Sequence, residues 1–378
     1  MRPARSELKL VLSLVMFGAA GCNALLGNGY GVDDTAGEML DGSSSGDPLA
    51  EGGGGVDGGT GPDGTTVSDG AVVTDATLDG SACPDGGCPA IKLTNAVGPQ
   101  RIALSTASLA WASLAGIGRV GLDGSKPETK PIAGLIATGL KRGVAVDAAG
   151  TTVYMTMPDA LGRGAGKCVG PLAACTLETF IGSAGAASSM ALDGTTLHVG
   201  IFASGGAYEV KGGSASAYFM NDKVLDLQVV GGKTFFRTAT EIRFVAPPTD
   251  TTASASAATL NGLTPLAFVV SGTTLIVGAS NGIHSCSGLP CIVAPSTVTA
   301  NAVSAVTADA TDIYWVEGTG GTVHRCARTP CDTTKTTLAT GQLMPNDIAV
   351  DGTAVYWANY GNATTGAGGS IMRLQKGP

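Results

Sequence analysis

A hairpin pattern that recurs along most of the sequence is the feature that most constrains its fold. The clearest copy is residues 347–357, which read Asp-Ile-Ala-Val-Asp-Gly-Thr-Ala-Val-Tyr-Trp. Ile348 and Val350 alternate with other residues as in a half-buried strand, and residues 354–357 form an apolar run typical of a buried strand. An Asp-Gly pair between two such segments is a strong signal for a tight turn. The pattern therefore predicts short antiparallel strands.

Seven copies of this hairpin can be aligned on the middle residue of the second strand. These residues are Ala110, Tyr154, His198, Phe235, Ile276, Tyr314 and Tyr356. Neighbouring copies lie 44, 44, 37, 41, 38 and 42 residues apart. A period near forty residues made of short strands is typical of β-propeller blades, and turn residues every few positions exclude a helical solenoid. We predict an all-β fold, a seven-bladed β-propeller of four-stranded antiparallel blades, with six blades as the alternative.

The clearest copies also predict the strands of each blade. The innermost strand covers residues 347–351 or 143–147, the second 354–359 or 152–156, the third 322–326 or 370–374, and the fourth 336–340. The last copy is too close to the end of the sequence to contain a fourth strand. We expect residues 91–94 to supply it and to close the ring, because an open ring would expose two apolar blade faces.

Several of these segments resemble the repeats of β-propellers of the YWTD or NHL type. Residues 118–125, 136–140 and 143–147 resemble one such repeat, and Tyr314-Trp315 and Tyr356-Trp357 stand where the YWTD family has its tyrosine and tryptophan. The resemblance covers residues 90–378 and implies the fold. Six blades and a Thr-Asp pair after the tryptophan are usual in that family, and neither is matched here. The resemblance implies no ligand.

The N-terminal region predicts export and lipid anchoring. Residues 1–21 have a basic start, an apolar stretch and a small-residue cleavage site, as in a signal peptide. Small residues directly before Cys22 resemble the lipobox of bacterial lipoproteins, which implies acylation of Cys22 and attachment to a membrane. Asn23 in place of aspartate then implies the outer membrane or the cell surface. Ordinary secretory cleavage that leaves a free thiol is the alternative.

Charge divides the rest of the chain into a tether and a body. Residues 22–82 are rich in glycine and aspartate and are predicted to be a disordered linker, and residues 83–378 the propeller. Residues 30–87 contain twelve acidic residues and no lysine or arginine, so the tether accounts for more than the whole net charge of −8. A nearly neutral body without a basic stripe argues against nucleic acid as a partner.

The cysteines after Cys22 form four close pairs. These are Cys83 with Cys88, Cys168 with Cys175, Cys286 with Cys291, and Cys326 with Cys331. In an exported protein such pairs predict disulfides, here between the third and fourth strands of three blades. Zinc would require pairs that converge. The only histidines, His198, His284 and His324, occupy repeat positions, so we predict no catalytic residue, no metal and no cofactor.

A ligand site is expected at one mouth of the channel, where the connections after the second strands meet those leading into the innermost strands. The longest connections of the first kind are residues 158–166 and 359–369. The polar candidates for ligand binding are Arg142, Asp159, Arg163, Asp347, Asn359, Tyr360 and Asn362.

Three functions fit these features. The favoured one is a membrane-anchored lipoprotein whose propeller binds a protein or glycan at the cell envelope without catalysis. The second is a lactonase-like propeller hydrolase or lyase, which would need acidic and amide ligands around a channel metal. The innermost strands are instead rich in Ala, Val, Leu and Ser, which argues against it. The third is a structural component of the envelope.

Overall fold

The computed structural model describes residues 89–132, 141–157, 164–181, 186–202, 205–219, 222–245, 254–293 and 298–377. The predicted signal peptide, Cys22, the linker and the Cys83–Cys88 pair lie outside these residues. In the described part of the chain no helix has the length and apolar character that crossing a bilayer requires.

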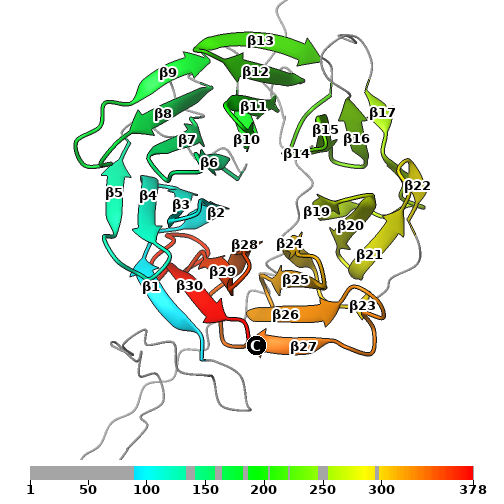
Figure 1. Ribbon diagram of the computed structural model, residues 1–378. Coiled ribbons are helices and arrows are strands. Elements are labelled where there is room, and N and C mark those ends of the chain that lie inside the picture. The colour runs from blue at the N-terminus through cyan, green and yellow to red at the C-terminus, as the bar shows by residue number, and fades with distance from the viewer. Residues whose placement is uncertain are drawn as a thin grey trace, which may run out of the picture. The chain divides into compact units, whose positions relative to one another are not determined.

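Seven four-stranded antiparallel sheets stand around a central channel (Figure 1). From the innermost strand outward, blade 1 is β2 (Pro99–Leu104), β3 (Ser108–Ser113), β4 (Gly116–Gly121) and β5 (Glu128–Pro131), and blade 2 is β6 (Val144–Val146), β7 (Thr152–Thr156), β8 (Ala165–Val169) and β9 (Glu178–Ile181). Blade 3 is β10 (Ala187–Asp193), β11 (Thr196–Ile201), β12 (Ala207–Lys211) and β13 (Ser214–Phe219), and blade 4 is β14 (Asp226–Val230), β15 (Lys233–Arg237), β16 (Ile242–Val245) and β17 (Ala255–Ser256).

The remaining blades follow the same order. Blade 5 is β19 (Pro265–Ser271), β20 (Thr274–Ala279), β21 (Gly282–Ser287) and β23 (Val298–Thr299), and blade 6 is β24 (Val303–Ala308), β25 (Asp312–Glu317), β26 (Thr322–Ala327) and β27 (Thr336–Ala339). Blade 7 is β28 (Pro345–Val350), β29 (Ala354–Asn359), β30 (Ser370–Gln375) and β1 (Ile91–Asn95), and a short parallel pair joins β18 (Ala258–Thr259) to β22 (Cys291–Ile292). Seven blades are confirmed, and the six-bladed alternative is excluded.

The two ends of the body close the ring, as the sequence predicts. In blade 7, β1 pairs antiparallel with β30, with Ile91 opposite Arg373 and Asn95 opposite Ser370. The first strand of the described chain therefore lies beside the last (Figure 1). Leu93 packs into the core between blades 7 and 1, so β1 also covers an apolar blade face.

The aligned repeat residues occupy equivalent places in the seven blades. Each of the seven is the third residue of the second strand of its blade. The aspartates before the tight turns act locally: Asp309 and Asp351 each accept hydrogen bonds on Oδ1 from the backbone amides two and three residues further on, at 2.7–2.9 Å. In these two hairpins the aspartate side chain therefore satisfies the amides of the turn.

The apolar core is divided among the blade interfaces. Seven clusters of buried residues occur, one for each pair of neighbouring blades. In blade 7, Tyr356 packs toward blade 1 and Trp357 toward blade 6. Trp111, Trp315 and Trp357 are each at most 1% exposed, so all three tryptophans serve packing.

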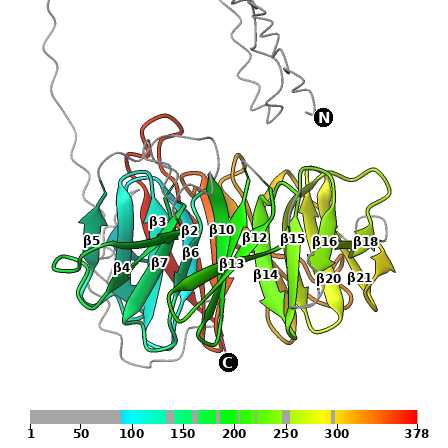
Figure 2. The ribbon, with the colours of Figure 1, turned by 90° about the horizontal axis from the view of Figure 1, so that it is seen from above.

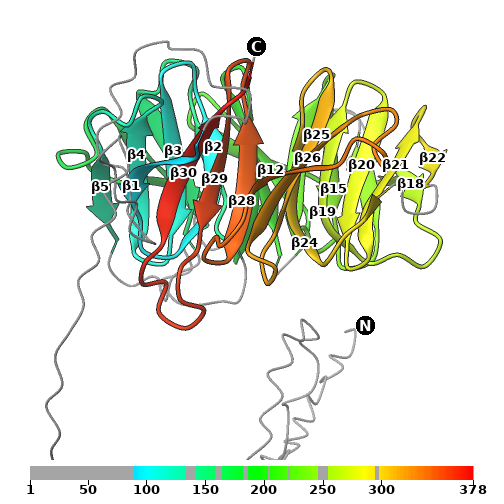
Figure 3. The ribbon, with the colours of Figure 1, turned by 90° about the horizontal axis from the view of Figure 1, so that it is seen from below.

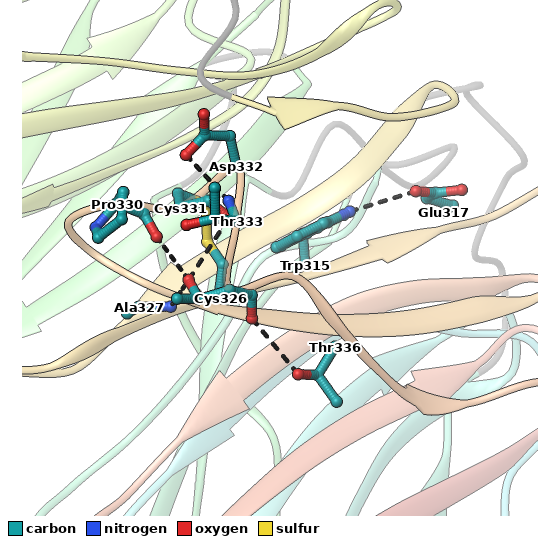
Figure 4. The surroundings of a disulfide bond; sticks show 10 residues. Trp315, Glu317, Cys326, Ala327, Pro330, Cys331, Asp332, Thr333 and Thr336 are labelled. Carbon is teal, nitrogen blue, oxygen red and sulfur yellow. Dashed lines mark hydrogen bonds between the residues drawn. A yellow bond between two sulfur atoms is a disulfide. The ribbon is translucent and has the colours of Figure 1, made fainter.

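Disulfides join the three described cysteine pairs, as predicted: Cys168–Cys175, Cys286–Cys291 and Cys326–Cys331. Each begins on the third strand of its blade. The last of them lies in the core between blades 5 and 6 together with Trp315, whose Nε1 donates to Glu317 Oε1 at 3.3 Å (Figure 4). The pairs lie on blades 2, 5 and 6, so they do not converge on one metal ion.

The two faces of the ring differ in what they carry. The β29–β30 connection projects from one face, and the C-terminus lies at the opposite face (Figures 2 and 3). We call the end of the channel on the first face, where the innermost strands begin, the channel mouth.

Candidate functional site

One repeat position places a residue of each blade at the channel mouth. In every blade it lies on or just before the innermost strand, opposite the fifth residue of the second strand. We call these seven residues the mouth ring: Arg101, Gly143, Ser189, Asp226, Ala267, Ala305 and Asp347. Within the mouth ring, charged side chains therefore come only from blades 1, 4 and 7.

The Arg101 guanidinium connects three blades. Its Nη2 lies 2.6 Å from Oδ2 of Asp226 in blade 4, and its Nη1 lies 3.5 Å from Oδ1 of Asp347 in blade 7. Because blades 1 and 4 are not neighbours, the Arg101 side chain crosses the channel. Burial by itself would lower the pKa of Arg101, but the two carboxylates outweigh it and hold that pKa above its ordinary value.

Asp347 is the most enclosed carboxylate of the mouth ring. Only 6% of the residue is exposed, and its Oδ2 accepts a hydrogen bond from the backbone amide of Ile102 at 2.8 Å. Burial raises the pKa of Asp347, although the charges of Arg101 and Lys141 act in the opposite direction.

Two further cations lie at the channel mouth without a carboxylate of their own. Lys141 Nζ donates to the backbone carbonyls of Ser304 at 3.0 Å and Asn346 at 2.7 Å, which belong to blades 6 and 7. Arg237, the residue opposite Asp226, donates from Nη1 to the carbonyl of Pro265 at 3.1 Å. Within the described ranges neither side chain forms an ion pair, and Arg237 Nε has no hydrogen-bond partner.

Burial governs the charge state of both cations. It lowers the pKa of Lys141 to about 7, helped by the neighbouring charge of Arg101, and it lowers the pKa of Arg237 to about 10. Arg237 is therefore charged at neutral pH, whereas the Lys141 amine is present in both the protonated and the neutral form.

A cavity of about 270 Å³ opens at the mouth ring and is lined by residues of all seven innermost strands or of the segments leading into them. Its surface is mainly polar. Gln228 on its wall is fixed by hydrogen bonds to the backbone of Val270, whereas the buried Ser189 Oγ has no hydrogen-bond partner among the described residues. The volume is at the lower end for a small-molecule site, which suits a single sugar unit or a short acid.

The structure distributes the predicted site residues over three environments. Asp347 belongs to the mouth ring. Arg142 is only 2% exposed and donates to the backbone carbonyl of Ser113, so it joins blade 2 to blade 1. Asn359 Nδ2 donates to Gln342 Oε1 at 2.9 Å, a hydrogen bond within the framework of blade 7.

The other candidates belong to connections. Tyr360 follows β29, and its backbone amide donates to the carbonyl of Met344 at 3.0 Å. Asn362 Oδ1 accepts from the backbone amides of Thr364 and Thr365 at 3.0 and 3.1 Å, as in a turn. Asp159 and Arg163 lie outside the described residues.

The expectation that small and apolar residues fill the innermost strands is wrong at the channel mouth. Arg101, Asp226, Lys141 and Arg237 were not among the predicted site residues, yet all four meet there. A signal for two of them is present in the sequence. In six of the seven repeats the mouth-ring residue stands nine positions before the aligned middle residue, and it is charged in only three of them.

The histidines do not reach the channel mouth. His198 lies on β11, His284 on β21 and His324 on β26, which are second or third strands. Burial lowers the pKa of His198 and of His324. Among the described residues no group of three or more His, Cys, Asp or Glu side chains is arranged to hold a metal ion.

Comparison with known proteins shows the fold. No protein-family model matches the sequence, and no curated protein matches it. Solved structures do. Virginiamycin B lyase from Staphylococcus aureus aligns with a TM-score of 0.59 at 14% identity, over 76% of this chain and 98% of its own. A streptogramin B lyase aligns with a TM-score of 0.57 at 13% identity, over 77% of this chain and 99% of its own. A catalytically inactive histidine-to-alanine variant of the staphylococcal lyase with quinupristin aligns with 0.53 at 14% identity over 76% and 98%.

Proposed function

We propose that this chain is an exported, lipid-anchored protein of the cell envelope whose propeller binds an acidic glycan at the channel mouth. The observation that carries the proposal is the pair of cations, Lys141 and Arg237, that have no ion-pair partner in the described part of the chain. A buried cation without a counter-ion is costly to keep in a fold. A carboxylate ligand would supply that counter-ion, and a guanidinium binds carboxylates through parallel hydrogen bonds.

The shape and chemistry of the mouth support a sugar rather than a peptide. Protein partners bind mainly through aromatic or aliphatic anchors that fill apolar pockets. The cavity is small and mainly polar, and its ring of side chains offers hydroxyl, carboxylate and guanidinium groups. The guanidiniums of Arg101 and Arg237 match the two carboxylates in number, and the protonated fraction of Lys141 adds positive charge, which favours a ligand of negative charge.

A propeller lyase is the second candidate, and the likeness to virginiamycin B lyase favours it. Replacement of one histidine makes that enzyme catalytically inactive, according to its variant structure. All three histidines of this chain lie on second or third strands, away from the mouth ring. A lyase reaction here would therefore need a different base, which makes binding the better-supported function.

Calorimetry with the methyl glycoside of glucuronic acid, and with the neutral methyl glucoside, tests the binding proposal. The purified propeller should bind the acidic sugar and not the neutral one. Arg237→Met should abolish the binding, whereas Arg325→Met, the same change on a third strand, should preserve it. Equal affinity for both sugars, or for both variants, contradicts the proposal, and binding of an acidic peptide alone would assign a protein partner instead.

The anchor is tested separately. Membrane fractions of cells that express the full chain should contain the protein, and Cys22→Ser should release it into the soluble fraction. Mass spectrometry of the mature N-terminus should find acylated Cys22. An unmodified N-terminus would contradict the anchor and leave the glycan site untouched.

A further inference from the structure

A second cavity, of about 300 Å³, lies between blades 7 and 1. Its wall is formed by the end of β1, the β3–β4 connection, the end of β5 and the segment just before β30. All of these lie on the face of the channel mouth, where the innermost strands begin. None of the described residues lines both cavities, so the two are separate.

The wall of this second cavity is mainly apolar and almost uncharged. Val97, which lines it, is 54% exposed, so an apolar side chain meets solvent there unless a ligand covers it. Lys130 is the only ionisable residue among those that line the cavity. A charged ligand would find at most one counter-ion, so an uncharged ligand fits this wall better.

Trp111 brings an indole N–H to the same wall, and the residue is only 1% exposed. Its counterparts in two other blades are satisfied. Trp315 Nε1 donates to Glu317 Oε1 at 3.3 Å, and Trp357 Nε1 donates to Gln342 Oε1 at 2.9 Å. In the described part of the chain Trp111 Nε1 has no acceptor, although a buried indole N–H usually has one.

The side chain that could accept this N–H is engaged elsewhere. The position two residues after the tryptophan is Glu317 in blade 6 and Ser113 in blade 1, and the Ser113 hydroxyl donates to the carbonyl of Gly116 at 3.2 Å. Trp111 Nε1 is nevertheless not sealed off, in contrast to the partnerless Arg237 Nε. Because Trp111 borders the cavity, its N–H is available to a molecule inside it.

The third strand also differs beside this tryptophan. The residue opposite it is His324 in blade 6 and Met372 in blade 7, but Gly118 in blade 1. The His324 ring stacks on Trp315 with the ring centroids 5.2 Å apart. A Cβ at position 118 would collide with the Trp111 indole, so this ring lies directly on the backbone of β4. Blade 1 therefore departs from blades 6 and 7 both in the acceptor and in the neighbour of its tryptophan.

We propose that this cavity is a second binding site, for a small uncharged molecule that has an apolar body and one carbonyl oxygen. The carbonyl oxygen accepts the hydrogen bond of Trp111 Nε1, and the apolar body covers Val97. The volume is at the lower end for a ligand site, which suits a single ring or a short acyl chain. The inference does not depend on sugar binding, because the two cavities share no residue.

A matched pair of probes tests the proposal on the full mature protein. Acetophenone and ethylbenzene have nearly the same size and differ by one carbonyl oxygen. Calorimetry should find that acetophenone binds about threefold to tenfold more tightly, which is the effect of one hydrogen bond. Acetophenone should also shift the indole N–H signal of Trp111 in nitrogen-15 NMR spectra and leave those of Trp315 and Trp357 in place. Equal affinity for the two probes, or an unshifted Trp111 signal, would overturn the proposal.

Variants locate the binding. Trp111→Phe removes the N–H and should abolish the preference for acetophenone, with cooperative thermal unfolding as the check that the variant is folded. Ala115→Leu, on the cavity wall, should weaken acetophenone binding at least about tenfold, because it overfills the space. Ala107→Leu, an equally exposed change in the β2–β3 connection, should leave it unaltered. Equal binding by these two leucine variants would contradict the site. Loss of methyl glucuronide binding by neither variant would show that the channel mouth acts independently.

Discussion

The blade interfaces and the mouth ring are built from the same repeat by opposite rules. At the interfaces the same residue type recurs at one strand position, since Trp111, Trp315 and Trp357 are equivalent and each is almost fully buried. At the mouth ring one position carries seven residues of four kinds: small, hydroxyl, acidic and basic. Neighbouring blades pack against every interface residue, whereas five of the seven mouth-ring residues border the cavity. The other two, Ala267 and Ala305, pack into interface clusters.

This difference shows that packing restricts the residues at the blade interfaces more strongly than those at the channel mouth. An interface residue must match the blade beside it, so its size and polarity are restricted in every repeat. A charged residue at the channel mouth needs an opposite charge, and that partner can come from a blade across the channel. Arg101 therefore forms ion pairs with Asp226 of blade 4 and Asp347 of blade 7. The four predictions that follow test the comparison, beginning with the largest expected effect.

The strand that closes the ring should matter most. Deleting residues 83–95 removes β1 and exposes both the edge of β30 and the core around Leu93. We expect the free energy of unfolding to fall by on the order of 5 kcal/mol or more, measured by urea denaturation with tryptophan fluorescence. Deleting residues 30–80 should leave the midpoint unchanged. Equal midpoints for both deletions would show that β1 does not close the ring.

An interface tryptophan comes next. Trp357→Ala should cost about 3–5 kcal/mol, because it leaves a cavity between blades 6 and 7. Leu343→Ala is the control, since Leu343 is 57% exposed and its truncation should change stability by about 0.5 kcal/mol or less. A similar small effect of both variants would mean that the interfaces are not the main source of stability.

The mouth ring should respond as a coupled unit. Arg101→Met alone leaves Asp226 and Asp347 without their counter-ion and should cost about 3 kcal/mol. Adding Asp226→Leu should recover part of that loss, giving a coupling energy of about 1–3 kcal/mol in a double-mutant cycle. Losses that simply add would show that Arg101 and Asp226 do not depend on each other. Methyl glucuronide binding should be lost even where stability returns.

Acid should act in opposite directions on the two kinds of aspartate. Hydrogen bonds from Thr353 and Ala354 outweigh burial and lower the pKa of Asp351, so its stabilisation is complete above the unfolded pKa of about 4 and is lost as the pH falls through its folded pKa. Burial raises the pKa of Asp347, so its stabilising contribution exists below that unfolded pKa and disappears as the pH rises through its folded pKa.

Melting temperatures of two variants between pH 6 and pH 3 measure this difference. Asp351→Asn should flatten the loss of stability in acid, and Asp347→Asn should steepen it, each by a smaller amount than the effects above. Parallel curves for the two variants would contradict the distinction between turn aspartates and mouth-ring aspartates.

Much of the fold could be predicted from the sequence because its determinants are local. The second strands, the tight turns and the disulfides depend on neighbours within a few residues, and the hairpin period counted the blades correctly. The strand 143–147 was predicted slightly too long, since β6 covers Val144–Val146 only. Closure by residues 91–94 could also be inferred, because the missing fourth strand of the last repeat left one segment to fill it.

The site was much harder to predict because its residues come from different repeats. Arg101 and Asp226 are 125 positions apart, and although both stand at the same repeat position, no local pattern indicates that they form an ion pair. Arg142 and Asn359 show the converse, since both are polar residues near the predicted mouth whose hydrogen bonds hold the framework. Polarity and position in a repeat identify candidates, but the partners of a side chain decide its role.

By itself, the sequence determined that this protein is a closed ring of seven antiparallel blades, because alternating strands and aspartate turns are properties of short segments. Only the tertiary structure decided what the channel contains. Seven positions of one repeat come together only when the ring closes. Arg101 then forms ion pairs with both Asp226 and Asp347, while Lys141 and Arg237 form none in the described chain. Electrostatic interaction depends on distance in space, and ring closure sets that distance.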